Sequence, residues 1–129
     1  MEKQDYINYW VKTSKDDLSS MESVFNAGKY DWALFIRHLA LEKILKALWV
    51  KNNTKNIPPK IHNLIKIADE AQYPKSEEEA LLFLEINDFN PEARYPDFKA
   101  DFNKKCTKEF AEGYLKKIKE LFQCIARLI

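Results

Sequence analysis

The chain has 129 residues, of which 46% are hydrophobic and 32% are charged, and its formal net charge at pH 7 is +1. This composition is typical of one folded domain over residues 1–129, and it argues against a disordered chain. Because positive and negative charges nearly balance, the chain lacks the broad electrostatic attraction behind sequence-independent nucleic-acid binding, and an RNA partner is not favoured.

Targeting signals and membrane spans are not expected. No run of about 18 apolar residues is free of charges, so no membrane partner is predicted. The polar start from Met1 to Asp5 does not resemble a signal peptide, which makes a cytoplasmic location the default. Cys106 and Cys124 are both expected in one last helix, about 27 Å apart along it, and are therefore predicted to be reduced thiols.

Helical periodicity runs through almost the whole chain, and no alternating β pattern extends beyond a few residues. A first helix is predicted from the apolar residues between Ile7 and Phe25, which recur at spacings of three, four and seven. Gly28 is placed to end this helix in a left-handed conformation, and Asp31 is expected to cap the second helix.

The second helix is predicted to end at Asn52, ahead of an extended turn that Pro58-Pro59 imposes. A shorter third helix follows, with apolar residues from Ile61 to Ala71. The run Ser76-Glu77-Glu78-Glu79 fits a capping box, in which the serine and the third glutamate satisfy each other's backbone amides. A fourth helix is therefore predicted to begin there and to run through Ile86.

The segment from Asn90 to Asn103 contains Pro91 and Pro96 and lacks a helical period, so it is predicted to be an ordered loop. A last helix follows, with one apolar stripe between Phe110 and Leu128. The whole pattern predicts five helices and no domain boundary.

The most informative segment runs from Tyr30 to Val50, because apolar side chains occupy most of the circumference of this predicted helix. Such a helix must be covered on nearly every side. Its polar residues form one narrow ribbon of Arg37, His38, Glu42, Lys43 and Lys46. We therefore predict an all-α up-and-down bundle of four to five helices with this helix at its centre, paired with a second copy as a homodimer. The ribbon either seals the dimer seam or lines a small site.

Several short motifs follow one another along the chain: Trp10 with Asp17-Leu18, then Gly28-x-Tyr30-Asp31-x-Ala33, Ala40-x-Glu42-Lys43-x-Leu45-Lys46-Ala47-Leu48, Pro58-Pro59-Lys60-x-His62-x-Leu64, and Asn87-Asp88-Phe89 before Arg94-Tyr95-Pro96. In this order they resemble the HEPN domain. The resemblance covers nearly the whole chain, and it implies a helical bundle, dimerisation, a prokaryotic origin and pairing with a small nucleotidyltransferase protein. It also implies, for many members, either ribonuclease activity or a nucleotide-binding role.

The ribonuclease members of the family carry an arginine followed, after four to six residues, by a histidine. In this chain the positions at that spacing after Arg37 and Arg94 are occupied by Glu42, Lys43, Ile44, Lys99, Ala100 and Asp101. Histidine is the side chain best suited to proton transfer near neutral pH, so its absence removes the expected chemistry. We therefore lean away from an enzyme and assign no catalytic residue.

Arg94 and Tyr95 are the first candidates for ligand binding. A guanidinium in a loop bounded by prolines can hold a phosphate with two hydrogen bonds, while the neighbouring ring stacks on a base. An equally supported interpretation is that Arg94 bonds to Asp88 or to helix C-terminal carbonyls and fixes the loop. Tyr95 follows whichever role Arg94 takes.

His62 is the family-matched histidine near the start of the third helix. It can donate to a ligand phosphate or to the carboxylate of Glu42, and the more common role is a structural hydrogen bond that fixes the turn. Ile61 stands where the family often has a threonine, so the matching helix cap is missing.

The ribbon supplies the remaining candidates. Glu42 and Lys46 can form a polar pocket, although pairing between residues four apart on a helix is the commoner explanation. His38 is either a hydrogen-bonding group at the dimer seam or a second basic group. The two histidines and two cysteines have no metal-ligand spacing, and neither a metal nor a cofactor is predicted.

Three hypotheses follow from these observations. The preferred one is a binding module that pairs with a nucleotidyltransferase and contacts a nucleotide through Arg94, Tyr95 and His62. The second is an unusual toxin ribonuclease of a toxin–antitoxin pair, in which His38 or His62 of one subunit meets an arginine of the other. The third is a dimeric scaffold whose polar ribbon only sets the dimer register.

Overall fold

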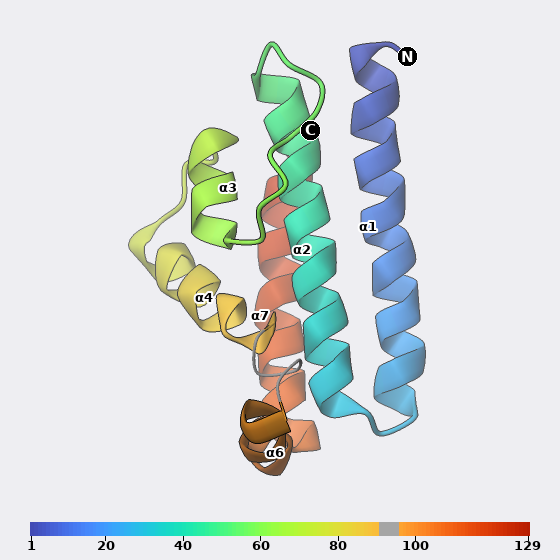
Figure 1. The fold of residues 1–129 in the computed structure, drawn as a ribbon, viewed down its shortest axis with the longest axis vertical. Helices are drawn as coiled ribbons and strands as arrows, with labels where there is room; N and C mark the ends of the chain where they lie inside the picture. The colour runs from blue at the N-terminus through green and yellow to red at the C-terminus, as the bar shows by residue number, and fades with distance from the viewer. Residues whose placement is uncertain (91–95) are drawn as a thin grey trace.

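The computed structural model describes the backbone of residues 1–90 and 96–129 and the side chains of residues 1–90 and 100–129. Within these residues the chain is helical and contains no strand. The helices, labelled as in Figure 1, are α1 (Lys3–Asn26), α2 (Tyr30–Asn52), α3 (Leu64–Glu70), α4 (Glu77–Asn87), α6 (Pro96–Lys105) and α7 (Lys108–Ala126). The predicted all-α fold is confirmed.

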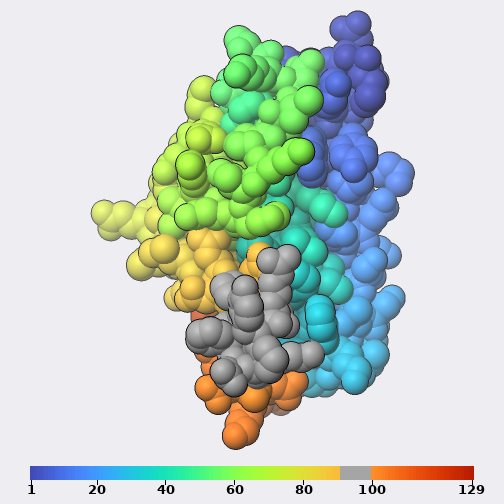
Figure 2. Space-filling model, viewed as in Figure 1, coloured from blue at the N-terminus to red at the C-terminus, as the bar shows by residue number. Residues whose placement is uncertain are grey.

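Helix α2 is the centre of the structure, as its sequence predicts. It runs antiparallel to α1 and lies against α7, and α3 and α6 also contact it (Figure 1). Its fully buried apolar side chains include Leu34, Leu41, Leu45 and Val50. Helix α7 packs mainly against α2. The space-filling view places α1 along one side of the molecule and α3 with α4 on the other (Figure 2).

The two long helices are fixed to each other at both ends. At the turn, Gly28 has a φ of +79°, a left-handed conformation that glycine adopts without strain. At the open end, Lys3 Nζ donates to the carbonyl oxygens of Val50 at 2.8 Å and Asn53 at 2.7 Å. A cation at this position is also favoured by the dipole of α2. Between the ends, Lys43 Nζ lies 2.8 Å from Asp17 Oδ2.

The segment after α4 differs from its prediction. We expected a loop from Asn90 to Asn103, but Pro96–Lys105 forms helix α6. Proline is favoured in the first turn of a helix, where its missing N–H is not needed, so Pro96 begins this helix instead of breaking it. Phe102 is buried and lies 5.5 Å from Phe89 between ring centroids. Cys106 follows α6 and precedes α7, so its expected place in the last helix is also wrong.

The helix caps confirm one sequence prediction and correct two. Ser76 and Glu79 form the predicted capping box at the start of α4. Asp31 does not cap α2: it lies in the first turn, buried, and accepts a hydrogen bond from Asn103 Nδ2 at 3.3 Å. Helix α3 begins at Leu64, later than expected, because Asn63 caps it through its side-chain oxygen.

Each helix in the described part of the chain is too short or too highly charged to cross a lipid bilayer.

Candidate functional site

The polar ribbon of α2 forms a row of buried ionisable side chains. His38, Glu42 and Lys46 follow one another at intervals of one helical turn, with 0%, 5% and 6% of their surface exposed. A buried charge is strongly unfavourable unless it is paired and hydrogen-bonded. The partners of each group therefore decide what this row can do.

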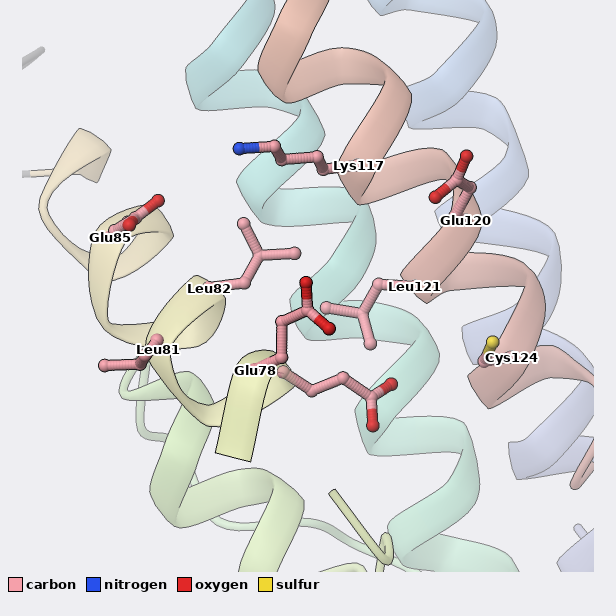
Figure 3. Close-up of a pocket in the computed structure, with 9 residues that line it drawn as sticks. Glu78, Leu81, Leu82, Glu85, Lys117, Glu120, Leu121 and Cys124 are labelled. Atoms are coloured by element: carbon pink, nitrogen blue, oxygen red, sulfur yellow. The ribbon is translucent and has the colours of Figure 1, made fainter. Parts of the chain in front are cut away.

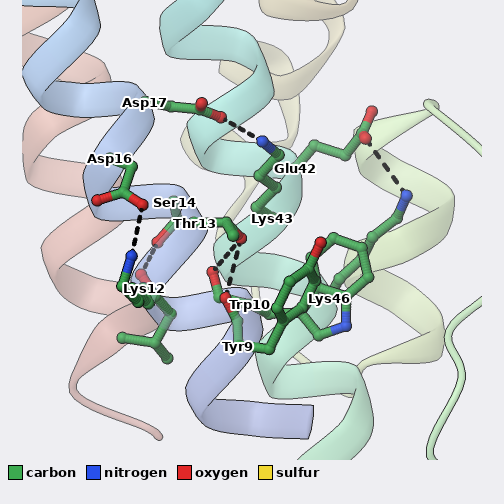
Figure 4. A network of polar contacts seen from close by, with 11 residues as sticks. Tyr9, Trp10, Lys12, Thr13, Ser14, Asp16, Asp17, Glu42, Lys43 and Lys46 are labelled. Carbon is green, nitrogen blue, oxygen red and sulfur yellow. Dashed lines mark hydrogen bonds and ion pairs between the residues drawn. The ribbon is translucent and has the colours of Figure 1, made fainter.

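Glu42 is the centre of a paired cluster. Its Oε1 lies 2.8 Å from Nδ1 of His62, and its Oε2 lies 3.3 Å from Nζ of Lys46 (Figure 4 shows the contact with Lys46). Both carboxylate oxygens are thus engaged. A bond from His62 to Glu42 and a pairing of Glu42 with Lys46 were both among the roles expected from the sequence, and the structure contains both.

His62 reaches Glu42 from the segment that connects α2 to α3. The neighbouring Asn63 caps α3 by accepting from the amides of Ile65 at 3.1 Å and Lys66 at 3.3 Å. Asn87 of α4 accepts from the amide of Leu64 at 2.9 Å. The backbone that carries His62 is therefore held from two directions, so the ring is positioned by α3 and α4 as well as by Glu42.

The exposed side of the imidazole is the accessible part of this cluster. The His62 side chain is 59% exposed, whereas the Glu42 side chain is 6% exposed. With Nδ1 directed at the carboxylate, Nε2 is the ring nitrogen left for a ligand. The arrangement can accept a proton or hydrogen bond at Nε2 when the ring is neutral, and donate one to an anion when it is charged.

Lys46 is held on its other side by an aromatic ring. Its Nζ lies 5.5 Å from the ring centroid of Trp10, a distance at which cation and ring attract. Trp10 also lines an apolar hollow of about 260 Å³, together with Met1, Tyr6, Tyr9, Asn56, Ile57 and Pro58. Lys46 is consequently a positioning partner for Glu42, and Trp10 lies between the cluster and this hollow.

The other half of the row is poorly paired among the described residues. Among the described residues, neither ring nitrogen of His38 nor Nε of Arg37 makes a hydrogen bond of good geometry, although the backbone of His62 acts on His38 and the charge of Glu22 acts on Arg37. Burial lowers the pKa of His38 to about 4, with the charge of Glu42 opposing the shift, and burial also lowers the pKa of Arg37. His38 is therefore neutral at neutral pH, and its ring is closed to solvent in this conformation.

The predicted site residues are only partly brought together. The structure joins His62, Glu42 and Lys46, and it separates His38 from solvent. Arg94 and Tyr95 lie outside the described residues. Trp10 and Asn63 were missed as site residues, although Trp10 belongs to the family motif, and asparagine directly before a helix is a preferred cap. The described residues hold no cluster of histidine, cysteine or acidic side chains that fits a metal ion.

The fold and this cluster define an all-helical domain built around one buried helix that holds a surface histidine through a buried carboxylate. A family model, the HEPN domain, matches residues 7–128, and the chain belongs to this family. The resemblance stated from the sequence is confirmed. HEPN domains are helical modules, many of which are ribonucleases or associate with nucleotidyltransferases. Neither the search of curated proteins nor the search of solved structures found a match.

Proposed function

We propose that this HEPN domain is a binding module that holds the phosphate of a nucleotide at the exposed edge of His62 and pairs with a small nucleotidyltransferase protein. The supporting observation is the contact of 2.8 Å between Glu42 and His62, which fixes the ring while leaving most of it open to solvent. A ligand that binds there finds the donor already oriented, so little ordering is needed on binding.

The groups around His62 suit an anionic ligand. A protonated ring donates from Nδ1 to Glu42 and from Nε2 to a phosphate oxygen. Lys46 shares the carboxylate but is only 6% exposed, so it supports the cluster without contacting a ligand. From the sequence, Arg94 and Tyr95 are proposed to add a second phosphate contact and a stacking surface.

Catalysis is not part of this proposal. The chain lacks the spacing of arginine and histidine used by the ribonuclease members, and His38, the histidine adjacent to Arg37, is neutral and buried. One observation favours the alternative of an unusual ribonuclease: a histidine oriented by a carboxylate is also a suitable general base. The experiment must therefore include RNA.

The test is thermal unfolding of the purified protein with AMP, ADP, ATP, GTP or CTP, compared with His62→Gln. A ligand that binds only the native state stabilises it by about 2.7 kcal/mol at a hundredfold excess over its Kd. We expect at least one nucleotide to raise the midpoint of the wild type, with the rise reduced in His62→Gln and in Arg94→Ala. Lys12→Gln, an exposed change on α1, is the matched control and should keep the full rise.

Two results would overturn the proposal. Equal rises of the unfolding midpoint in the wild type and in His62→Gln would show that the nucleotide binds elsewhere. No rise with any nucleotide would show that none of them is a ligand. Incubation with RNA is expected to leave it intact. Cleavage that disappears in His62→Gln would instead establish the ribonuclease alternative. The homodimer and the nucleotidyltransferase partner are tested by the mass of the protein in solution and by co-purification with the nucleotidyltransferase.

A further inference from the structure

A groove separates α4 from α7, and none of the three side chains of the cluster at Glu42 lines it. Its cavity has a volume of about 390 Å³ and is lined by Glu78, Glu79, Leu81, Leu82, Glu85, Lys117, Glu120, Leu121 and Cys124. Figure 3 shows Leu82 and Leu121 facing each other across it, with Lys117 reaching over from α7. Three leucines therefore give the groove apolar surface among charged side chains, and both walls are regular helices.

Two side-chain contacts join the α4 segment to α7 beside this groove. Tyr114 Oη donates to Glu85 Oε2 at 2.8 Å, and the rings of Phe89 and Tyr114 meet edge to face at 5.1 Å. The α4 wall carries Leu81, which is 61% exposed, and Leu84 of the same helix, outside the lining, is 52% exposed. Exposed leucines beside an apolar groove are a feature of surfaces that bind another protein.

The charged side chains that line the groove indicate the charge of the partner it can bind. Four glutamates and one lysine line it, although the whole chain has a net charge of +1. Glu79 is used in the capping box and Glu85 by Tyr114. Glu78 and Glu120 are exposed and have no ion-pair partner among the described residues, so their charges are available to a partner.

We propose that this groove binds a basic amphipathic helix of a protein partner. Apolar side chains of that helix enter between Leu82 and Leu121, while its lysines or arginines pair with Glu78 and Glu120. An amphipathic helix in an apolar groove is a common mode of recognition, and opposite charges at the rim set its orientation. The inference rests on the proposed function for the existence of a protein partner, and it assigns the surface and the chemistry of the contact.

The cysteines make the groove directly observable. Cys124 lines it and is half-buried, whereas Cys106 lies outside it and is buried. The probe is a synthetic amphipathic helix with one leucine face and one lysine face, added while the alkylation of Cys124 by a maleimide is followed by peptide mass spectrometry. We expect saturating peptide to slow the alkylation of Cys124 in the wild type about tenfold or more. The same helix with glutamate in place of lysine should leave the rate unchanged.

Charge reversal separates this groove from general attraction to acidic surfaces. The double variant Glu78→Lys with Glu120→Lys changes two exposed side chains, so the fold should persist, and it is expected to lose the protection. Glu109→Lys with Glu112→Lys, two exposed glutamates of α7 outside the groove, is the matched control and should retain it.

Three results would contradict the inference. The first is a failure of the lysine peptide to protect Cys124 in the wild type, and the second is equal protection in both double variants. The third is a change in the mass of the protein in solution on reversing Glu78 and Glu120 without peptide, because the groove would then hold a second copy of this chain. Any of these results, together with an intact nucleotide response at His62, would contradict the proposed role of the groove without contradicting the proposed nucleotide site.

Discussion

The two halves of the polar row on α2 are similarly buried, but they differ in how well their polar atoms are paired. Glu42 and Lys46 find partners at 2.8 Å and 3.3 Å, from the histidine of another segment and from each other. Arg37 and His38, one turn earlier, keep buried nitrogen atoms that make no hydrogen bond of good geometry to any described residue. The paired half presents a ligand-ready histidine, whereas the unpaired half lowers stability, since an unsatisfied buried polar group is unfavourable by about 1–3 kcal/mol.

The largest effect is expected from breaking the paired half. Glu42→Ala leaves the ammonium of Lys46 buried without its counter-charge, and removal of one partner of a buried ion pair destabilises a protein by about 3–5 kcal/mol. Urea unfolding measures the change. Lys43→Ala removes the more exposed pair with Asp17 and should change the free energy of unfolding by no more than about 1 kcal/mol. Similar losses of unfolding free energy in both variants would mean that the Glu42 cluster contributes no more to stability than the more exposed pair.

The next effect is a dependence of stability on pH that comes from His38. Its pKa is about 4 in the folded protein and about 6.5 when unfolded, so between these values only the unfolded chain binds the proton. The free energy of unfolding should therefore fall as the pH drops from about 7 to about 4, by about 3 kcal/mol in total.

The contribution of His38 is isolated by urea unfolding over this pH range in the wild type and in His38→Gln, which should lose that part of the slope. Glu42 and His62 are the ionisable groups whose charges act on His38. His62→Gln serves as the comparison and should keep most of the slope. An unchanged slope in His38→Gln would show that the ring is not protected from protons.

A smaller effect of opposite sign is expected at Arg37. The side chain is buried, Nε has no hydrogen-bond partner among the described residues, and the charge of Glu22 does not cancel the effect of burial on the pKa. Arg37→Met therefore keeps the length of the side chain and removes a poorly compensated charge. Replacing buried charged groups with apolar ones of similar volume is often neutral or stabilising, and here we expect a gain of up to about 1 kcal/mol in urea unfolding. A loss of more than about 2 kcal/mol would reveal a partner that stabilises the guanidinium.

The smallest effect on stability is expected at His62. Its side chain is 59% exposed, and glutamine can still donate to Glu42, so His62→Gln should change the free energy of unfolding by less than about 1 kcal/mol. The same variant is predicted to lose the nucleotide response. A small change in stability with a large change in binding would separate the ligand role of this residue from a structural one.

Local sequence patterns predicted the helices well where a single feature decided the outcome. The apolar circumference of α2 forced it into the centre, and the capping box at Ser76 fixed the start of α4. Helix α6 was missed because Pro96 was interpreted as a breaker, although a proline in the first turn is compatible with a helix. Asp31 was assigned to a cap because its sequence position suits one, but its partner is Asn103, far along the chain.

Only the part of the candidate site that lies within one helix was predictable from residue spacing. The pairing of Glu42 with Lys46 follows from their separation by four residues. Residue spacing does not predict that His62, and not His38, is the accessible histidine. The sequence places His38 on the same ribbon and gives no measure of its burial. Burial of His38 is set by the packing of segments that come together only in the folded chain.

The hydrogen bonds from Lys3 to Val50 and Asn53 have a consequence for local opening. A helical hairpin that is joined at one end by its turn ordinarily unzips from the other end. Here the first residue of α1 clasps the last turn of α2, so fluctuations that separate the helices must begin elsewhere. We expect the backbone amides in the last turn of α2 to exchange with deuterium more slowly than those beside Gly28, reversing the usual order of fraying.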